Sequence, residues 1–236
     1  MQKGAYEMSQ QMSEDVHKTE VGESKRLDGR LLIGAAAAVA LVLIGAFVVF
    51  QSREAAPVAE EVATSFVEAF GAFNAEQAIT YLADDADISQ VISSVGAQGV
   101  EGTLGEFRLL LSLLEAQGYK QMLDSCEELG SSASGTSLSC AFDYHNFRSD
   151  EIGRGPFSGS SFSLTVRDGE IVQARMDFGI DEFSPQMWEP FAGWVSKAYP
   201  EDAAVMYDGD SGVRLTEESI GLWERHTRGY VEEVGR

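Results

Sequence analysis

Residues that supply metal ligands and nucleophiles are scarce in this sequence, which holds two cysteines and three histidines among 236 residues. His17, His145 and His226 each stand alone, without a cysteine, a second histidine or paired carboxylates at the spacing of a metal site. The chain also lacks GxSxG, Walker-type and HExxH motifs. The sequence therefore predicts neither a metal site nor a cofactor.

The segment from Asp208 to Gly212 has some acidic residues of a calcium-binding loop. However, the twelfth position counted from Asp208 is Ser219, where such a loop needs a bidentate glutamate. Gly212 occupies the fifth position, although the loop requires glycine at the sixth. We expect a turn here and no calcium site.

Basic residues are also few, 17 against 38 acidic ones, which gives a formal net charge of −21. A field of this sign repels nucleic acid and anionic lipid, so nucleic acid is excluded as a partner. We interpret the acidic residues mainly as a solubilising surface, and an acidic binding face is the alternative.

Long apolar runs are absent except for one, LLIGAAAAVALVLIGAFVVF at residues 31–50. Its length matches the requirement for an α-helix to cross about 30 Å of hydrocarbon. A cleaved signal peptide is the first alternative, but its apolar region is usually shorter and precedes a small-residue cleavage site. A buried core helix is the second, but it would show a polar stripe. We therefore expect a transmembrane helix at 31–50.

The residues that flank this run predict its orientation. Lys25, Arg26 and Arg30 precede it, whereas Arg53 and then Glu54 follow it. By the positive-inside rule, a tail of residues 1–30 lies in the cytoplasm, and its composition predicts disorder. The chain is thus expected to be a single-pass protein of the cell membrane, with a linker at 51–57 and an extracytoplasmic domain after it.

Cys126 and Cys140 are expected to form a disulfide. An exported domain is exposed to oxidising conditions. Residues 120–130 and 136–146 read as two strands around a turn at 131–135, and pairing centred on Ala133 places the two cysteines opposite each other. Two buried free thiols are the alternative.

The remaining patterns predict an α+β fold. Helices are expected at 58–73, 75–82 and 104–117, the last beginning with a capping box of Thr103 and Glu106. Alternating polar and apolar residues predict two more strands at 157–167 and 170–178, joined by a turn at Asp168-Gly169. Two further helices are expected at 184–199 and from about Thr216 onwards. We interpret Asp84, Asp85 and Asp87 as a solvated helix end and turn.

Two segments resemble the nuclear-transport-factor-2-like superfamily, in its SnoaL-like branch. The first is FVEAFGAFNAEQAITYLADDADI at residues 66–88, and the second is FSLTVRDGEIVQARM at 162–176. The resemblance implies a cone-shaped domain at 58–200, in which a curved antiparallel sheet and N-terminal helices enclose an apolar pocket. Residues 201–236 would form a C-terminal extension with a helix. The candidate pocket residues are Phe66, Tyr81, Gln90, Tyr144 and Asp177.

The same resemblance locates the catalytic positions of the isomerase-like members. Their tyrosine oxyanion donor, carboxylate base and buried carboxylic acid fall on Phe66, Gln90 and Ser160. None of these side chains can perform the corresponding role well, because phenylalanine has no hydroxyl and an amide is no base. No catalytic residue is therefore predicted.

Two functions remain open after this reading. The first is a non-catalytic, membrane-anchored module that binds a small apolar ligand or an envelope protein, with a homodimer also conceivable. The second is a SnoaL-like cyclase, isomerase or hydratase with relocated catalytic groups. Trp188, Trp194 and Trp223 could cover a pocket or a partner surface, but ordinary packing against the sheet is the preferred explanation for them.

Overall fold

The computed structural model describes residues 58–209 and 212–235. The expected tail, transmembrane segment and linker lie outside these residues. Among the residues that are described, no helix has both the length and the apolar character needed to cross a membrane.

The helices are α2 (Ala59–Gly71), α3 (Ala75–Ile79), α4 (Ser89–Ser93), α5 (Leu104–Ala116), α6 (Ile180–Phe183), α7 (Glu189–Ala198), α8 (Pro200–Met206) and α9 (Glu217–Val234). The strands are β1 (Leu82–Asp87), β2 (Lys120–Ser132), β3 (Gly135–His145), β4 (Phe157–Arg167), β5 (Glu170–Asp177), β6 (Tyr207–Asp208) and β7 (Gly212–Val213).

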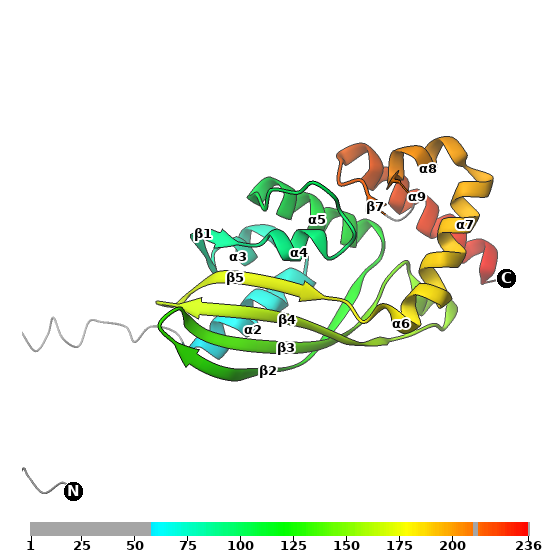
Figure 1. Ribbon diagram of the computed structural model, residues 1–236. Coiled ribbons are helices and arrows are strands. Elements are labelled where there is room, and N and C mark those ends of the chain that lie inside the picture. Colours follow the sequence, from blue (N-terminus) through cyan, green and yellow to red (C-terminus); the bar gives the residue numbers. More distant parts are fainter. Residues whose placement is uncertain (1–57, 210–211, 236) are drawn as a thin grey trace, which may run out of the picture. The chain divides into compact units, whose positions relative to one another are not determined.

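Five strands form one curved sheet in the order β1-β5-β4-β3-β2 (Figure 1). The four strands predicted from alternating residues are all present and pair antiparallel. The α+β class is thus confirmed. The prediction of a purely antiparallel sheet is wrong, because β1 pairs parallel to β5 and makes the sheet mixed.

Strand β1 replaces the helix end and turn expected at the acidic segment. Helix α3 already ends at Ile79, and Leu82 lies opposite Ile171 of β5. The amide of Ile171 also donates a 2.8 Å hydrogen bond to the carbonyl of Tyr81. Aspartate is uncommon in β-strands. At the edge of a sheet, however, its charged side chain can stay in water while the neighbouring strand forms hydrogen bonds with its backbone. Asp84 and Asp85 are accordingly exposed.

Helix α2 packs against one face of the sheet, and α5 contacts α2 through its aromatic side chain. Phe66 and Phe70 of α2 lie 6.0 and 5.1 Å from the ring of Phe162 on β4, measured between ring centroids. Phe107 of α5 joins them, 6.3 Å from Phe66. Helix α5 begins with the predicted capping box, in which the hydroxyl of Thr103 accepts a 3.2 Å hydrogen bond from the amide of Glu106. Burial of these large rings supplies much of the driving force for this layer.

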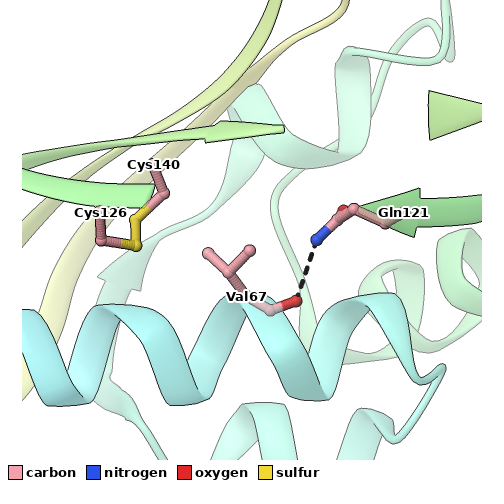
Figure 2. Close-up of a disulfide and its surroundings, with 4 residues drawn as sticks. All are labelled: Val67, Gln121, Cys126 and Cys140. Atoms are coloured by element: carbon pink, nitrogen blue, oxygen red, sulfur yellow. Dashed lines mark hydrogen bonds between the residues drawn. A yellow bond between two sulfur atoms is a disulfide. The ribbon is translucent and has the colours of Figure 1, made fainter. Parts of the chain in front are cut away.

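Strands β2 and β3 are joined by the predicted disulfide between Cys126 and Cys140 (Figure 2). Near its first residue, β2 is also connected to helix α2. There the side-chain amide of Gln121 donates a 3.2 Å hydrogen bond to the carbonyl of Val67 on α2. Covalent and hydrogen-bonded links therefore both fix β2, which is an edge strand of the sheet.

The C-terminal helices differ in detail from the two that were expected. The predicted helix at 184–199 starts earlier, as α6, passes through a π-helical turn at Ser184–Trp188 and continues as α7. It ends before Pro200 as expected, but the chain then resumes as α8. Helix α9 begins directly after Thr216, whose hydroxyl caps it. The short strands β6 and β7 pair antiparallel, with Asp208 opposite Gly212, and the turn expected between them falls largely on residues 210–211, outside the described residues.

Candidate functional site

A cavity of about 280 Å³ lies at the end of the sheet where β3 and β5 finish. Its aromatic lining residues are Tyr144, Phe147, Phe178, Phe183 and Trp188. Its other lining residues are Ser94, Val95, Gly96, Gln117, Asn146, Ile180, Ser184 and Val213. None of these described residues carries a carboxylate, imidazole, amine or guanidinium group. The lining is therefore formally uncharged and mainly apolar, and its polar side-chain groups are two carboxamides, two serine hydroxyls, the Tyr144 hydroxyl and the Trp188 indole N–H.

The wall that follows β3 depends on an unusual backbone conformation. Phe147 and Arg148 have φ angles of +54° and +55°, in the left-handed region that residues other than glycine rarely occupy. The ring of Phe147 lies 4.8 Å from Phe191 and 5.5 Å from Trp223, and these contacts hold the conformation in place. Strained backbone of this kind clusters at functional sites.

The opposite wall carries the π-helical turn. Pro185 lies in this turn and has no N–H to donate, so the regular hydrogen-bond ladder of an α-helix is interrupted there. The turn presents Ser184 and Trp188 to the cavity. Trp188 stacks on Trp223 at 6.2 Å and lies 5.9 Å from Phe147. Turns of the π type are rare and frequently occur at functional sites.

Two buried carboxamides form the polar part of the wall. Asn146 follows β3 directly and Gln117 follows α5; their exposed fractions are 7% and 3%. The side-chain amide of Asn146 donates a 3.2 Å hydrogen bond to the side-chain oxygen of Gln117. The backbone amide of Phe147 donates a 2.8 Å hydrogen bond to the side-chain oxygen of Asn146. Both side chains are thus oriented by the protein itself.

Tyr144 is the only titratable residue among those that line the cavity. Its hydroxyl donates a 3.1 Å hydrogen bond to the carbonyl of Gly179. Burial raises the pKa of Tyr144 well above its ordinary value, because a phenolate would lose its hydration. The group is therefore neutral at physiological pH and cannot act as a base there. The neighbouring Gly179 amide donates a 3.0 Å hydrogen bond to the hydroxyl of Ser160.

The C-terminal part of the chain completes the cavity. The amide of Val213 in β7 donates a 3.1 Å hydrogen bond to the carbonyl of Gly96, and both residues line the cavity. Val213 also forms a parallel bridge with Ala97. Since Trp188 and Val213 come from beyond the five-stranded sheet, the segment after β5 forms part of the cavity wall.

The structure does not bring the five candidate pocket residues together. Tyr144 alone lines the cavity. Phe66 is completely buried in the core, and Tyr81 is half-buried beside β1. Gln90 and Asp177 are exposed, and Gln90 borders a separate hollow on the outer, polar side of the sheet. The three positions compared with isomerase catalytic residues, Phe66, Gln90 and Ser160, are likewise absent from the cavity lining.

Sequence reasoning missed the carboxamides Gln117 and Asn146. Gln117 directly follows a leucine-rich helix and Asn146 directly follows a strand. Polar residues are common at both kinds of position, so neither residue stands out in the sequence. Only the fold brings these two residues, 29 positions apart, into hydrogen-bond contact. Of the three tryptophans that were considered as a cover for a pocket, Trp188 lines the cavity and Trp223 packs behind it.

Within residues 58–209 and 212–235, no group of three or more His, Cys, Asp or Glu side chains is arranged to hold a metal ion. His226 instead contacts one carboxylate, with 2.7 Å between its Nε2 and Oδ2 of Asp202. This pair links α8 to α9.

No protein-family model and no curated protein matches this chain. Solved structures do. A candidate polyketide cyclase from Pseudomonas putida is 16% identical with a TM-score of 0.38, over 55% of this chain and 98% of that one. A protein of unknown function described as NTF2-like, from Cytophaga hutchinsonii, is 14% identical with a TM-score of 0.37, over 54% and 95%. An LEH-like epoxide hydrolase from Mycobacterium tuberculosis is 16% identical with a TM-score of 0.34, over 60% and 96%. Similarities this low assign no activity to the present chain.

Proposed function

We propose that this chain is a membrane-anchored module with a SnoaL-like domain, which binds a small apolar ligand without transforming it. The observation that carries the proposal is the lining of the cavity by aromatic and aliphatic side chains with a few oriented polar groups. Small-molecule sites typically have this composition. The burial of an apolar ligand against such rings would supply the binding free energy.

The absence of proton-transfer groups supports binding over catalysis. A cyclase, isomerase or hydratase of the SnoaL-like kind needs a base and a charged or strongly polar oxyanion partner at the reacting atoms. None of the described lining residues offers a carboxylate or a histidine. Tyr144 stays neutral, and its hydroxyl already donates a hydrogen bond to the carbonyl of Gly179.

The location of the module is proposed from the sequence together with the disulfide. Residues 31–50 would cross the membrane, with basic residues on the cytoplasmic side and the domain outside the cytoplasm. A disulfide between Cys126 and Cys140 fits such an oxidising compartment. In this arrangement the ligand is taken up outside the cytoplasm, and an envelope protein is the other partner considered.

Binding of an uncharged fluorescent probe tests this proposal. The full-length chain in lipid nanodiscs would be titrated with the solvatochromic ketone prodan, and empty nanodiscs give the background. Val95 lines the cavity, so Val95→Trp should fill part of the space and weaken binding more than about 10-fold. Leu104 is exposed at the start of α5 and does not line the cavity, so Leu104→Trp is the matched control.

Two results would contradict the proposal. One is that the wild-type chain binds no more prodan than empty nanodiscs. The other is that Val95→Trp binds as tightly as Leu104→Trp, which would locate the probe elsewhere. Turnover of a steroid or polyketide substrate by the wild-type chain would support the enzymatic alternative instead.

A further inference from the structure

We infer that the cavity selects a neutral ligand with a hydrogen-bond acceptor, such as a ketone, ester or lactone carbonyl, and that Gln117 is the residue that donates to it. This inference rests on the proposed function, because it assigns the chemistry of the same site. It is carried by the hydrogen bonds that fix the two buried carboxamides.

The orientation of Asn146 follows from its backbone partner. The amide of Phe147 is a donor, so the atom of Asn146 that lies 2.8 Å away must be the side-chain oxygen. The side-chain nitrogen of Asn146 therefore points to Gln117. Rotating this carboxamide by half a turn would set one donor against another, so the assignment is fixed by the network.

The orientation of Gln117 follows in turn. Its oxygen receives the 3.2 Å hydrogen bond from Asn146, so its side-chain nitrogen Nε2 occupies the remaining position. This nitrogen donates to none of the residues that the structure describes, although Gln117 is only 3% exposed and lines the cavity. Because Nε2 is not among the buried polar atoms that lack a partner, it is open to the cavity, where the acceptor of a ligand can replace water as its partner.

The rest of the lining argues against a charged ligand. None of the described lining residues is a lysine, arginine or histidine that could neutralise a carboxylate, and none is an acid that could neutralise an amine. An unpaired charge in an apolar cavity loses its hydration without compensation. The chain's net charge of −21 further disfavours anions.

A matched ligand series tests the inference on the full-length chain in lipid nanodiscs. The probes are 2-acetylnaphthalene, 2-ethylnaphthalene and 2-naphthoate, which share one ring system and differ in the acceptor and the charge. Equilibrium dialysis against empty nanodiscs gives each affinity. Wild-type chain is compared with Gln117→Leu, which removes the donor but keeps a similar volume, and with Gln117→Met as a second variant.

The ratio of the affinity for the ketone to the affinity for the hydrocarbon tests whether Gln117 donates to the carbonyl. It should fall about 3- to 10-fold in both variants, the range expected for the loss of one neutral hydrogen bond. The hydrocarbon should still bind the variants, which shows that the cavity remains folded. In the wild-type chain, 2-naphthoate should bind at least about 10-fold more weakly than the ketone.

Three results would overturn the inference, and only one of them also overturns the proposed function. An unchanged ratio in the variants removes the role of Gln117. Tighter binding of 2-naphthoate than of the ketone removes the selection for neutral ligands. Both of these leave an apolar binding cavity in place. Failure of all three probes to bind the wild-type chain would contradict the proposed function itself.

Discussion

Cys126 lies directly opposite Cys140 because a β-bulge at Leu129 shifts the register of β2 against β3 by one residue. On the turn side of the bulge Gly130 pairs with Ser137, whereas beyond it Glu128 pairs with Leu138. Without the bulge, Cys126 would lie opposite Ala141. Bulges of this kind are common at sheet edges, where they also discourage further strand pairing.

Removing the disulfide should destabilise the domain. It closes a loop with a sequence separation of 14 residues, for which the chain-entropy model gives about 3 kcal/mol. We expect the double substitution Cys126→Ser with Cys140→Ser to lower the free energy of unfolding by about this amount, followed by tryptophan fluorescence in urea. Ser125→Ala, on the neighbouring residue of β2, is the control. Finding two thiols that react with alkylating reagents in the native protein would contradict the assignment.

Two glycines should respond in opposite ways to the same substitution. A Cβ at Gly179 would collide with the backbone carbonyl of Ser158, whereas a Cβ at Gly193 on α7 meets nothing within 4 Å. We expect Gly179→Ala to cost about 1–3 kcal/mol of stability. Gly193→Ala should stabilise by about 0.5–1 kcal/mol, because alanine loses less backbone entropy in a helix. Thermal unfolding of both variants measures this, and a stabilising Gly179→Ala would show that the backbone near Ser158 can move.

The contribution of Glu106 should depend on pH. Hydrogen bonds from the backbone amides of Thr103 and Glu101 lower the pKa of Glu106 below its ordinary value of 4.5. A lowered pKa in the folded state means that the stabilisation is complete above about pH 4.5 and is lost as the pH falls below it. The difference in free energy of unfolding between the wild-type chain and Glu106→Ala should therefore shrink between about pH 6 and about pH 3. For Ser112→Ala, on the same helix, the difference should stay constant, and a pH-independent Glu106→Ala difference would refute the assignment.

Restoring a tyrosine at the isomerase position should harm stability and yield no activity. Phe66 is completely buried among Phe70, Phe107 and Phe162, where a phenolic hydroxyl would find no partner. We expect Phe66→Tyr to cost about 1–3 kcal/mol. In Phe73→Tyr the hydroxyl can reach water, because Phe73 is only partly buried, so the cost should be smaller. Isomerisation of an unsaturated ketosteroid by Phe66→Tyr would contradict this view of the site.

Local patterns predicted those parts of the fold that depend on neighbouring residues. The alternation in β2 to β5 and the capping box of Thr103 with Glu106 could be read directly, because side-chain periodicity and caps are local properties. Strand β1 could not, because its pairing is supplied by Ile171 of β5 rather than by its own acidic sequence. The cysteine pairing was predicted correctly, but the bulge at Leu129 that produces it has no signal in the sequence.

The site was less predictable than the fold for a related reason. Tyr144 could be proposed from its place on a strand, but only the structure shows that its ring packs against Phe178 and Phe183 of the cavity wall. The resemblance directed attention to Phe66 and Gln90, which the structure places outside the cavity. Gln117 and Asn146 gain their role only through contact with each other. Such contacts between distant residues leave no pattern in a single sequence.

The most direct test of a ligand-binding role is to identify what the chain carries after purification from its native cells. Mass spectrometry of a solvent extract from the full-length chain should find a neutral, largely apolar molecule with a carbonyl or similar acceptor, bound in a defined ratio. The same molecule should be strongly depleted from Val95→Trp, in which the cavity is filled, and retained in Leu104→Trp. Recovery of no such molecule, or of equal amounts from all three proteins, would contradict the account.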